Sequence, residues 1–70
     1  MNVIALFKTT RNVVRGEELG SRAGIPLTVI PTPKQFTKNC GMSLRFDEQY
    51  VGLLIELLEK ENIYVTIFRG

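Results

Sequence analysis

The chain of 70 residues contains no histidine, no tryptophan and a single cysteine, Cys40. One cysteine cannot form an internal disulfide, and one cysteine without histidine cannot complete a zinc site. A cysteine nucleophile is usually activated by a neighbouring base such as histidine, so a papain-like hydrolase is excluded. We therefore expect no metal and no cofactor, and the thiol of Cys40 is the best candidate for chemistry.

Several other features are absent. The sequence has no glycine-rich phosphate loop and no C-x-x-C pair, so the motifs of nucleotide binding and of disulfide exchange are both missing. The net charge is only +2, which is too small a surplus to indicate a nucleic-acid partner. The first apolar run, residues 3–7, is short and follows no basic segment, so we expect neither a signal peptide nor a membrane contact. An unpaired cysteine then suits the reducing cytoplasm.

The hydrophobic pattern predicts six elements in one domain over residues 1–70. Strands are expected over residues 3–7, 27–30, 42–46 and 64–68. Helices are expected after the threonines at 9 and 10 and after Asp47, ending near Gly24 and Asn62. The order β-α-β-β-α-β predicts an α+β, ferredoxin-like two-layer sandwich, with two helices on one face of a four-stranded antiparallel sheet.

Particular side chains carry further expectations. Gly16 and Gly20 fall on one side of the first helix, which indicates a close approach to the sheet. Alternation directs Met42 into the core and Arg45 away from it, where Arg45 is expected to pair with Glu48. We expect Phe36 to fold back on the neighbouring prolines.

The strands carry apolar residues on both faces, although a two-layer sandwich leaves one sheet face open. Ile4 and Leu6 oppose Val3 and Ala5 in the first strand, and the last strand shows the same feature. A solvated face should alternate more cleanly. The pattern predicts a partner on the open face, most simply a second copy in a homo-oligomer.

Cys40 lies in a long polar loop, residues 34–41, between the second and third strands. The topology directs this loop to the edge where the first strand ends and the first helix begins. A helix N-terminus and nearby cations lower the pKa of a thiol, and Gly41 permits close backbone approach or an unusual φ. The expected site comprises the Cys40 thiol with five binding residues: Gly41, Lys34, Lys38, Thr10 and Arg11. A buried, inert cysteine is the alternative.

Several of these residues form a recognisable set, namely Phe7 with Thr10, Glu17, Gly24-Ile25, Ile30-Pro31-Thr32-Pro33-Lys34, Cys40-Gly41 and Leu44-Arg45-Phe46. In them the chain resembles the putative selenium/sulfur carrier-like family over nearly its whole length. It departs from the family in residues 13–16, where alanine is usual, and at Lys34, where arginine is common. The resemblance implies that Cys40 carries sulfur or selenium between sulfur- or selenium-transferring enzymes, as a carrier rather than a stand-alone catalyst.

Two other functions remain open from the sequence. The chain could be a regulatory or oligomerisation module whose partner lies on the open sheet face, in which case Cys40 is incidental. It could also bind small anions through Lys34, Lys38 and the N-terminus of the first helix.

Overall fold

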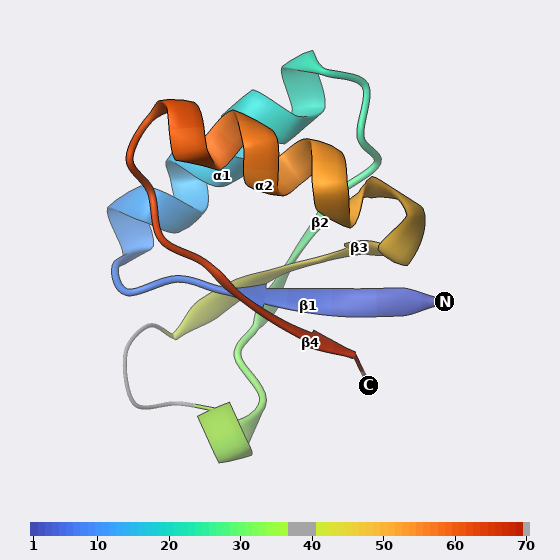
Figure 1. Cartoon of the computed structure of the whole chain (residues 1–70). Coiled ribbons are helices and arrows are strands. Elements are labelled where there is room, and N and C mark those ends of the chain that lie inside the picture. Colours follow the sequence, from blue (N-terminus) through green and yellow to red (C-terminus); the bar gives the residue numbers. More distant parts are fainter. Residues whose placement is uncertain (37–40, 70) are drawn as a thin grey trace.

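The computed structural model describes residues 1–36 and 41–69 and shows two helices above one sheet (Figure 1). The elements in chain order are β1 (Asn2–Leu6), α1 (Thr10–Arg22), β2 (Thr28–Pro31), the 3₁₀ turn η1 (Lys34–Phe36), β3 (Met42–Asp47), the 3₁₀ turn η2 (Glu48–Tyr50), α2 (Val51–Lys60) and β4 (Thr66–Arg69). All neighbouring strands are antiparallel, in the order β2-β3-β1-β4. The prediction of a ferredoxin-like α+β fold is confirmed.

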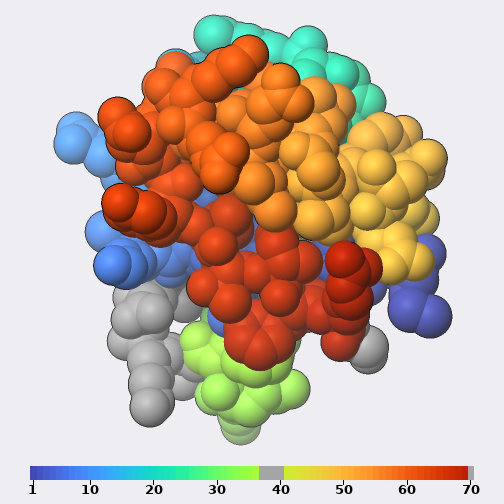
Figure 2. Space-filling view, viewed as in Figure 1, coloured from blue at the N-terminus to red at the C-terminus, as the bar shows by residue number. Residues whose placement is uncertain are grey.

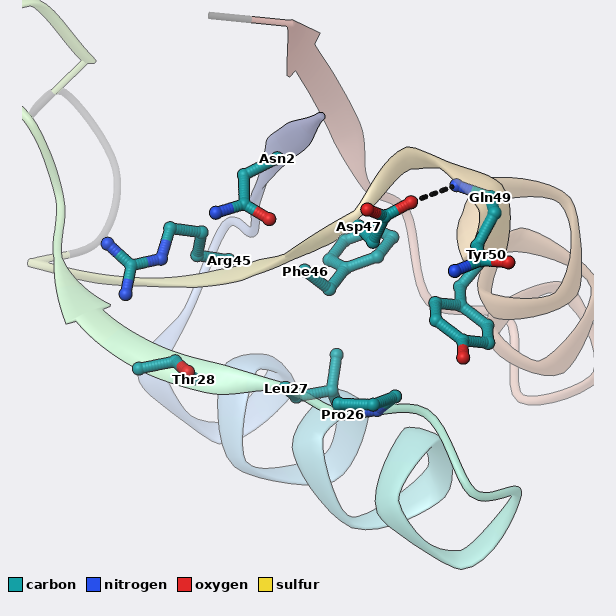
Figure 3. Close-up of a pocket in the computed structure, with 9 residues that line it drawn as sticks. All are labelled: Asn2, Pro26, Leu27, Thr28, Arg45, Phe46, Asp47, Gln49 and Tyr50. Carbon is teal, nitrogen blue, oxygen red and sulfur yellow. Dashed lines mark hydrogen bonds between the residues drawn. The ribbon is translucent and has the colours of Figure 1, made fainter.

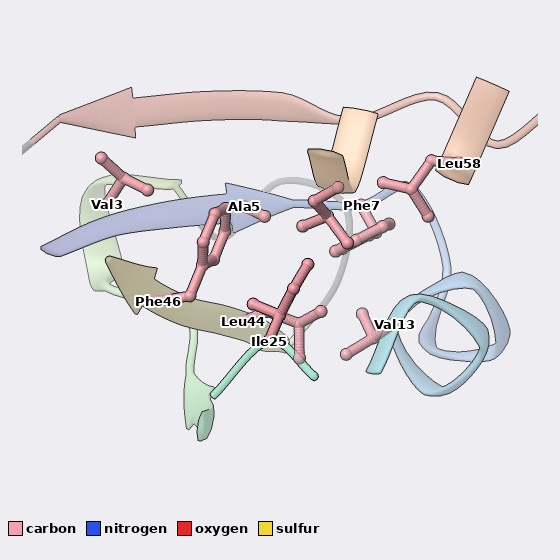
Figure 4. Close-up of a cluster of buried hydrophobic side chains, with 9 residues drawn as sticks. Val3, Ala5, Phe7, Val13, Ile25, Leu44, Phe46 and Leu58 are labelled. Atoms are coloured by element: carbon pink, nitrogen blue, oxygen red, sulfur yellow. The ribbon is translucent and has the colours of Figure 1, made fainter. Parts of the chain in front are cut away.

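The core lies between the helices and one face of the sheet (Figure 4). Nine apolar residues in the described part of the chain are buried there: Val3, Ala5, Phe7, Val13, Ile25, Leu44, Phe46, Leu54 and Leu58. Each large side chain of this kind contributes about 1.5–3 kcal/mol when it is fully buried. The prediction for Met42 is wrong, because this residue at the start of β3 is 39% exposed.

The two glycines of α1 allow the helix to approach its neighbours closely. A Cβ atom at Gly16 would lie 2.9 Å from the ring of Phe7, and one at Gly20 would lie 2.5 Å from Leu27. Both distances are too short for a real side chain, so the expected close approach is confirmed at both positions. Gly24 then ends α1 with a φ of +86°, and the Ile25 amide donates to the Gly20 carbonyl at 2.9 Å.

The turn η1, at the start of the β2–β3 connection, lies on the sheet face opposite the helices (Figure 1). Its Phe36 ring packs on the ring of Phe68 in β4, with 4.2 Å between the ring centroids. Figure 2 shows η1 directly against β4. Because β2 and β4 are opposite edge strands of the sheet, the segment from the end of β2 to Phe36 extends across this face to β4. The sequence pattern did not predict this contact.

The open sheet face is therefore partly covered by the chain itself. Ile4 and Leu6 point to this face and are half-buried, while Phe68 is 36% exposed. Part of the apolar character that we assigned to a partner is thus explained by the β2–β3 connection.

Candidate functional site

Hydrogen bonds anchor the β2–β3 connection where it leaves β2 and enters β3. The Thr32 amide donates to the Gly41 carbonyl at 2.9 Å, one residue beyond the last strand pair, Pro31 with Met42. The hydroxyl groups of Thr32 and Ser43 are 2.6 Å apart, and both residues are buried. The residue that directly follows Cys40 in the sequence is therefore held by the sheet.

The anchor lies at the edge of the sheet that is formed by strand ends, where β1 ends and β3 begins. Ala5 pairs with Leu44 in the antiparallel β1–β3 ladder, so the start of β3 lies beside the end of β1. The chain passes from the end of β1 into α1, whose first turn is capped by the Thr9 hydroxyl, 3.1 Å from the Asn12 amide. The register thus brings the end of β1, the start of α1 and the Gly41 end of the connection to one edge, as the topology predicted.

Not all of the predicted site residues fall in the described part of the chain. Cys40 and Lys38 lie outside the described residues, so their predicted roles stay predictions. Gly41 is exposed. A Cβ atom at Gly41 would meet no described atom within 4 Å. Close backbone approach, one of the two reasons that we gave for a glycine at this position, is therefore not seen among the described residues.

The remaining predicted residues are exposed and come from two elements. Thr10 and Arg11 are the first two residues of α1, at the edge described above. Lys34 begins η1, on the far side of the sheet from the helices. A further cation at this edge is Lys8, whose Nζ lies 5.6 Å from the centroid of the Tyr64 ring.

The helical layer has its own ion pairs. The Arg15 guanidinium pairs with Glu18, and it also contacts Glu61 at 3.1 Å. Hydrogen bonds to Glu18 and then to Glu61 raise the pKa of Arg15 above its usual value. Glu18 also forms an ion pair with Arg22 at 3.5 Å. These side chains tie the two helices to each other and take no part in the predicted site.

The predicted pair of Arg45 with Glu48 is wrong. Glu48 instead accepts from Arg69 in β4 at 2.6 Å. Arg45 points to the open sheet face, away from the helices, and lines a groove of about 370 Å³ (Figure 3). The groove is lined by Asn2, Pro26, Leu27, Thr28, Arg45, Phe46, Asp47, Gln49 and Tyr50. Sequence reasoning missed it, and the available signal was an outward-facing arginine in a strand that alternates between apolar and polar residues.

Asp47 is the acidic group of this groove. Its carboxylate accepts from the Gln49 amide at 3.0 Å and lies 3.3 Å from the amine of Met1. The hydrogen bond from Gln49, followed by that from the amine, lowers the pKa of Asp47 below its usual value of 3.8. Asp47, predicted as the N-cap of the second helix, caps the 3₁₀ turn η2 that leads into α2, and the N-cap residue of α2 itself is Tyr50.

Within residues 1–36 and 41–69, no three His, Cys, Asp or Glu side chains form a group that could hold a metal ion. Within the same ranges, no helix has the length and apolar character needed to cross a membrane.

The fold and the anchored connection define a small ferredoxin-like domain whose one cysteine is carried by the β2–β3 connection. The chain belongs to the family described as Putative Se/S carrier protein-like, whose model matches residues 2–68. No curated protein and no solved structure matches the chain.

Proposed function

We propose that this chain carries sulfur or selenium as a persulfide or selenopersulfide on Cys40. The observation that supports the proposal most strongly is family membership combined with composition. The sequence contains one cysteine and two methionines, and a methionine thioether has no thiol that could become a persulfide. If the chain carries sulfur or selenium on a cysteine, Cys40 must be that residue.

Transfer through Cys40 needs no added oxidant or reductant. In loading, the Cys40 thiolate attacks the outer sulfur of a persulfide on a donor enzyme. A new S–S bond forms at Cys40, the donor S–S bond breaks, and the donor cysteine leaves as a thiolate. In unloading, an acceptor thiolate attacks the outer sulfur or selenium and Cys40 leaves as the thiolate. The partners are therefore sulfur- or selenium-transferring enzymes, and the chain acts as a carrier rather than as a stand-alone enzyme.

The described part of the chain supports a setting that favours a thiolate. Thr10 and Arg11 begin α1 at the edge where Gly41 is anchored, and a helix N-terminus stabilises anions. Lys34 adds a cation on the connection itself, and Lys38 precedes Cys40 by two residues. A reducing compartment such as the cytoplasm would keep the single thiol available.

The test is the pH dependence of Cys40 alkylation by iodoacetamide, measured by intact mass. We expect fast labelling with a midpoint well below the reference thiol pKa of about 8.5. Arg11→Gln should raise the midpoint, because a cation is lost at the α1 N-terminus. Arg22→Gln, which removes a cation at the other end of α1, should leave it unchanged.

Two results would contradict the carrier. One is a midpoint at or above the reference value, or labelling that appears only in denaturant. The other is a Cys40→Ser variant that remains folded and still accepts sulfur from a persulfide donor.

A second candidate is an interaction module that forms a homo-oligomer through the open sheet face. It is supported by the apolar side chains that the connection leaves partly exposed there, notably Phe68. An unreactive thiol, together with an oligomer in sedimentation that Cys40→Ser does not alter, would favour this function over the carrier.

A further inference from the structure

Arg45 forms no ion pair with any carboxylate in the described part of the chain. In contrast, Arg15, Arg22 and Arg69 each pair with a glutamate. Arg45 is exposed and lies in the middle strand pair of the open face, between Ile4 of β1 and Thr28 of β2. An unpaired guanidinium in this position is available to an anion from outside the chain.

The groove beside Arg45 has a structural cause. Thr28 with Arg45 is the first pair of the β2–β3 ladder. Two residues before Thr28 stands Pro26, which has no amide hydrogen and cannot extend the ladder towards Asp47. The two strands therefore separate at this point, and the groove opens between Pro26–Thr28 and η2 (Figure 3).

The polar groups of the groove suit a carboxylate. The side chains of Asn2, Thr28 and Gln49, which line the groove together with Arg45, offer amide and hydroxyl donors. Asp47 is the acidic side chain in the lining, and its two oxygens are already engaged by the Gln49 amide and the Met1 amine. An incoming carboxylate would therefore meet one unpaired cation and one carboxylate whose charge is partly offset.

The distribution of charge over the whole molecule also favours an acidic partner at the groove. Of the seven acidic residues, five lie in α1 or in α2 and its C-cap, namely Glu17, Glu18, Glu56, Glu59 and Glu61. Because the same elements also hold Arg11, Arg15, Arg22 and Lys60, the helical layer carries a net charge of −1, whereas the rest of the chain carries +3. Arg45 and Lys34 lie on the opposite side, with the β2–β3 connection, so an acidic partner surface would be directed to that side.

We propose that the groove between β2 and η2 binds a carboxylate side chain from an acidic segment of the protein partner, with Arg45 as its ion-pair partner. That this partner is the donor or acceptor enzyme rests on the function proposed for Cys40. Ser43, which binds Thr32 at the root of the connection, lies two residues from Arg45 on the same face, a Cα separation of about 7 Å. A partner of ordinary footprint, about 800 Å² per side, would cover both.

The test uses a short polyglutamate peptide as the probe, titrated into the ¹⁵N-labelled full chain and followed by NMR. We expect amide shifts centred on Asn2, Thr28 and Gln49, and binding that weakens as NaCl is added. Arg45→Gln should weaken the peptide affinity about tenfold, since a hydrogen bond to a charged group is lost. Arg22→Gln removes the same charge from the helical layer and should leave the affinity unchanged. A polylysine peptide should give no shifts at the groove.

Three outcomes would overturn the proposal: no shifts, shifts spread over the helices, or equal weakening by Arg22→Gln and Arg45→Gln. Arg45 would then serve only to keep the sheet face hydrated. The outcome is independent of the thiol, because Cys40→Ser should bind the peptide as the parent chain does. A reactive Cys40 without peptide binding would support the carrier function and contradict the groove proposal. Peptide binding with an unreactive Cys40 would support the groove proposal and contradict the carrier function.

Discussion

Ser43 is buried on the sheet face that has no helix above it, although serine is usually an exposed residue. Its hydroxyl is satisfied by Thr32, which is 9% exposed. The pair fixes the root of the β2–β3 connection from below the sheet. A buried hydroxyl without such a partner would be costly, so the two residues depend on each other.

Ser43→Ala should lower the free energy of unfolding by about 1–3 kcal/mol, because the buried Thr32 hydroxyl loses its partner. Thr32→Val should cost a similar amount, and the double variant less than the sum of the two. Urea denaturation measures all three values, with Ser21→Ala in the exposed face of α1 as the control. Strictly additive costs would show that the two hydroxyl groups do not act as a pair.

At the scale of single residues, the sequence correctly predicted roles that depend on residues nearby in the chain. Asp47 caps η2, and Asn62, expected to end the second helix in a left-handed conformation, has a φ of +57°. Pairings between distant segments were missed or assigned wrongly. Glu48 was placed with Arg45, three residues earlier, whereas its partner Arg69 comes from β4. The spacing of residues along the sequence does not show whether Glu48 lies beside a side chain of β3 or of β4.

The β2–β3 connection is the element that the sequence described least well. We predicted a polar loop over residues 34–41, and the structure shows that it includes the turn η1 at Lys34–Phe36. The order of the strands along the chain was predictable because each strand has its own hydrophobic pattern. The position of η1 on the open face involves the contact between Phe36 and Phe68, which no periodicity indicates. For Cys40 itself the sequence provides the residue type, and its environment stays a prediction.

Phe68→Ala should release η1 from the sheet. The Phe36 amide donates to the Pro33 carbonyl at 2.8 Å, and this turn is supported by the ring contact with Phe68. Losing an aromatic pair worth about 1 kcal/mol should speed hydrogen exchange of the Phe36 amide about fivefold. Tyr64→Ala removes an aromatic side chain that is 77% exposed just before β4 and serves as the control. Unchanged exchange at Phe36 in Phe68→Ala would mean that η1 is held by other contacts.

At the scale of the whole molecule, the absence of histidine determines the response to pH. Without histidine, few groups titrate between the carboxylates and the amines, so stability should be nearly constant from about pH 5.5 to 7. The acid side is different because the folded chain lowers the pKa of Asp47 below its unfolded value. The stabilisation from this group is present above the unfolded pKa and is lost as the pH falls through the folded pKa.

We therefore expect the thermal unfolding midpoint to be level near neutral pH and to fall below about pH 4. Asp47→Asn keeps a side chain that can cap η2 but removes the titrating group, so its acid decline should be shallower. Circular dichroism at a series of pH values measures both chains. An identical acid decline in the two chains would assign the effect to other carboxylates.

The place of β1 in the sheet also bears on when the protein can fold in the cell. β1 is made first, yet Val3 pairs with Phe46 on one side and with Arg69 on the other. While the ribosome is still adding residues, this strand therefore lacks one of its neighbours until the last strand has left the exit tunnel. The nascent chain can bring β1, α1, β2 and β3 together earlier, but the sheet is completed only after Arg69 emerges.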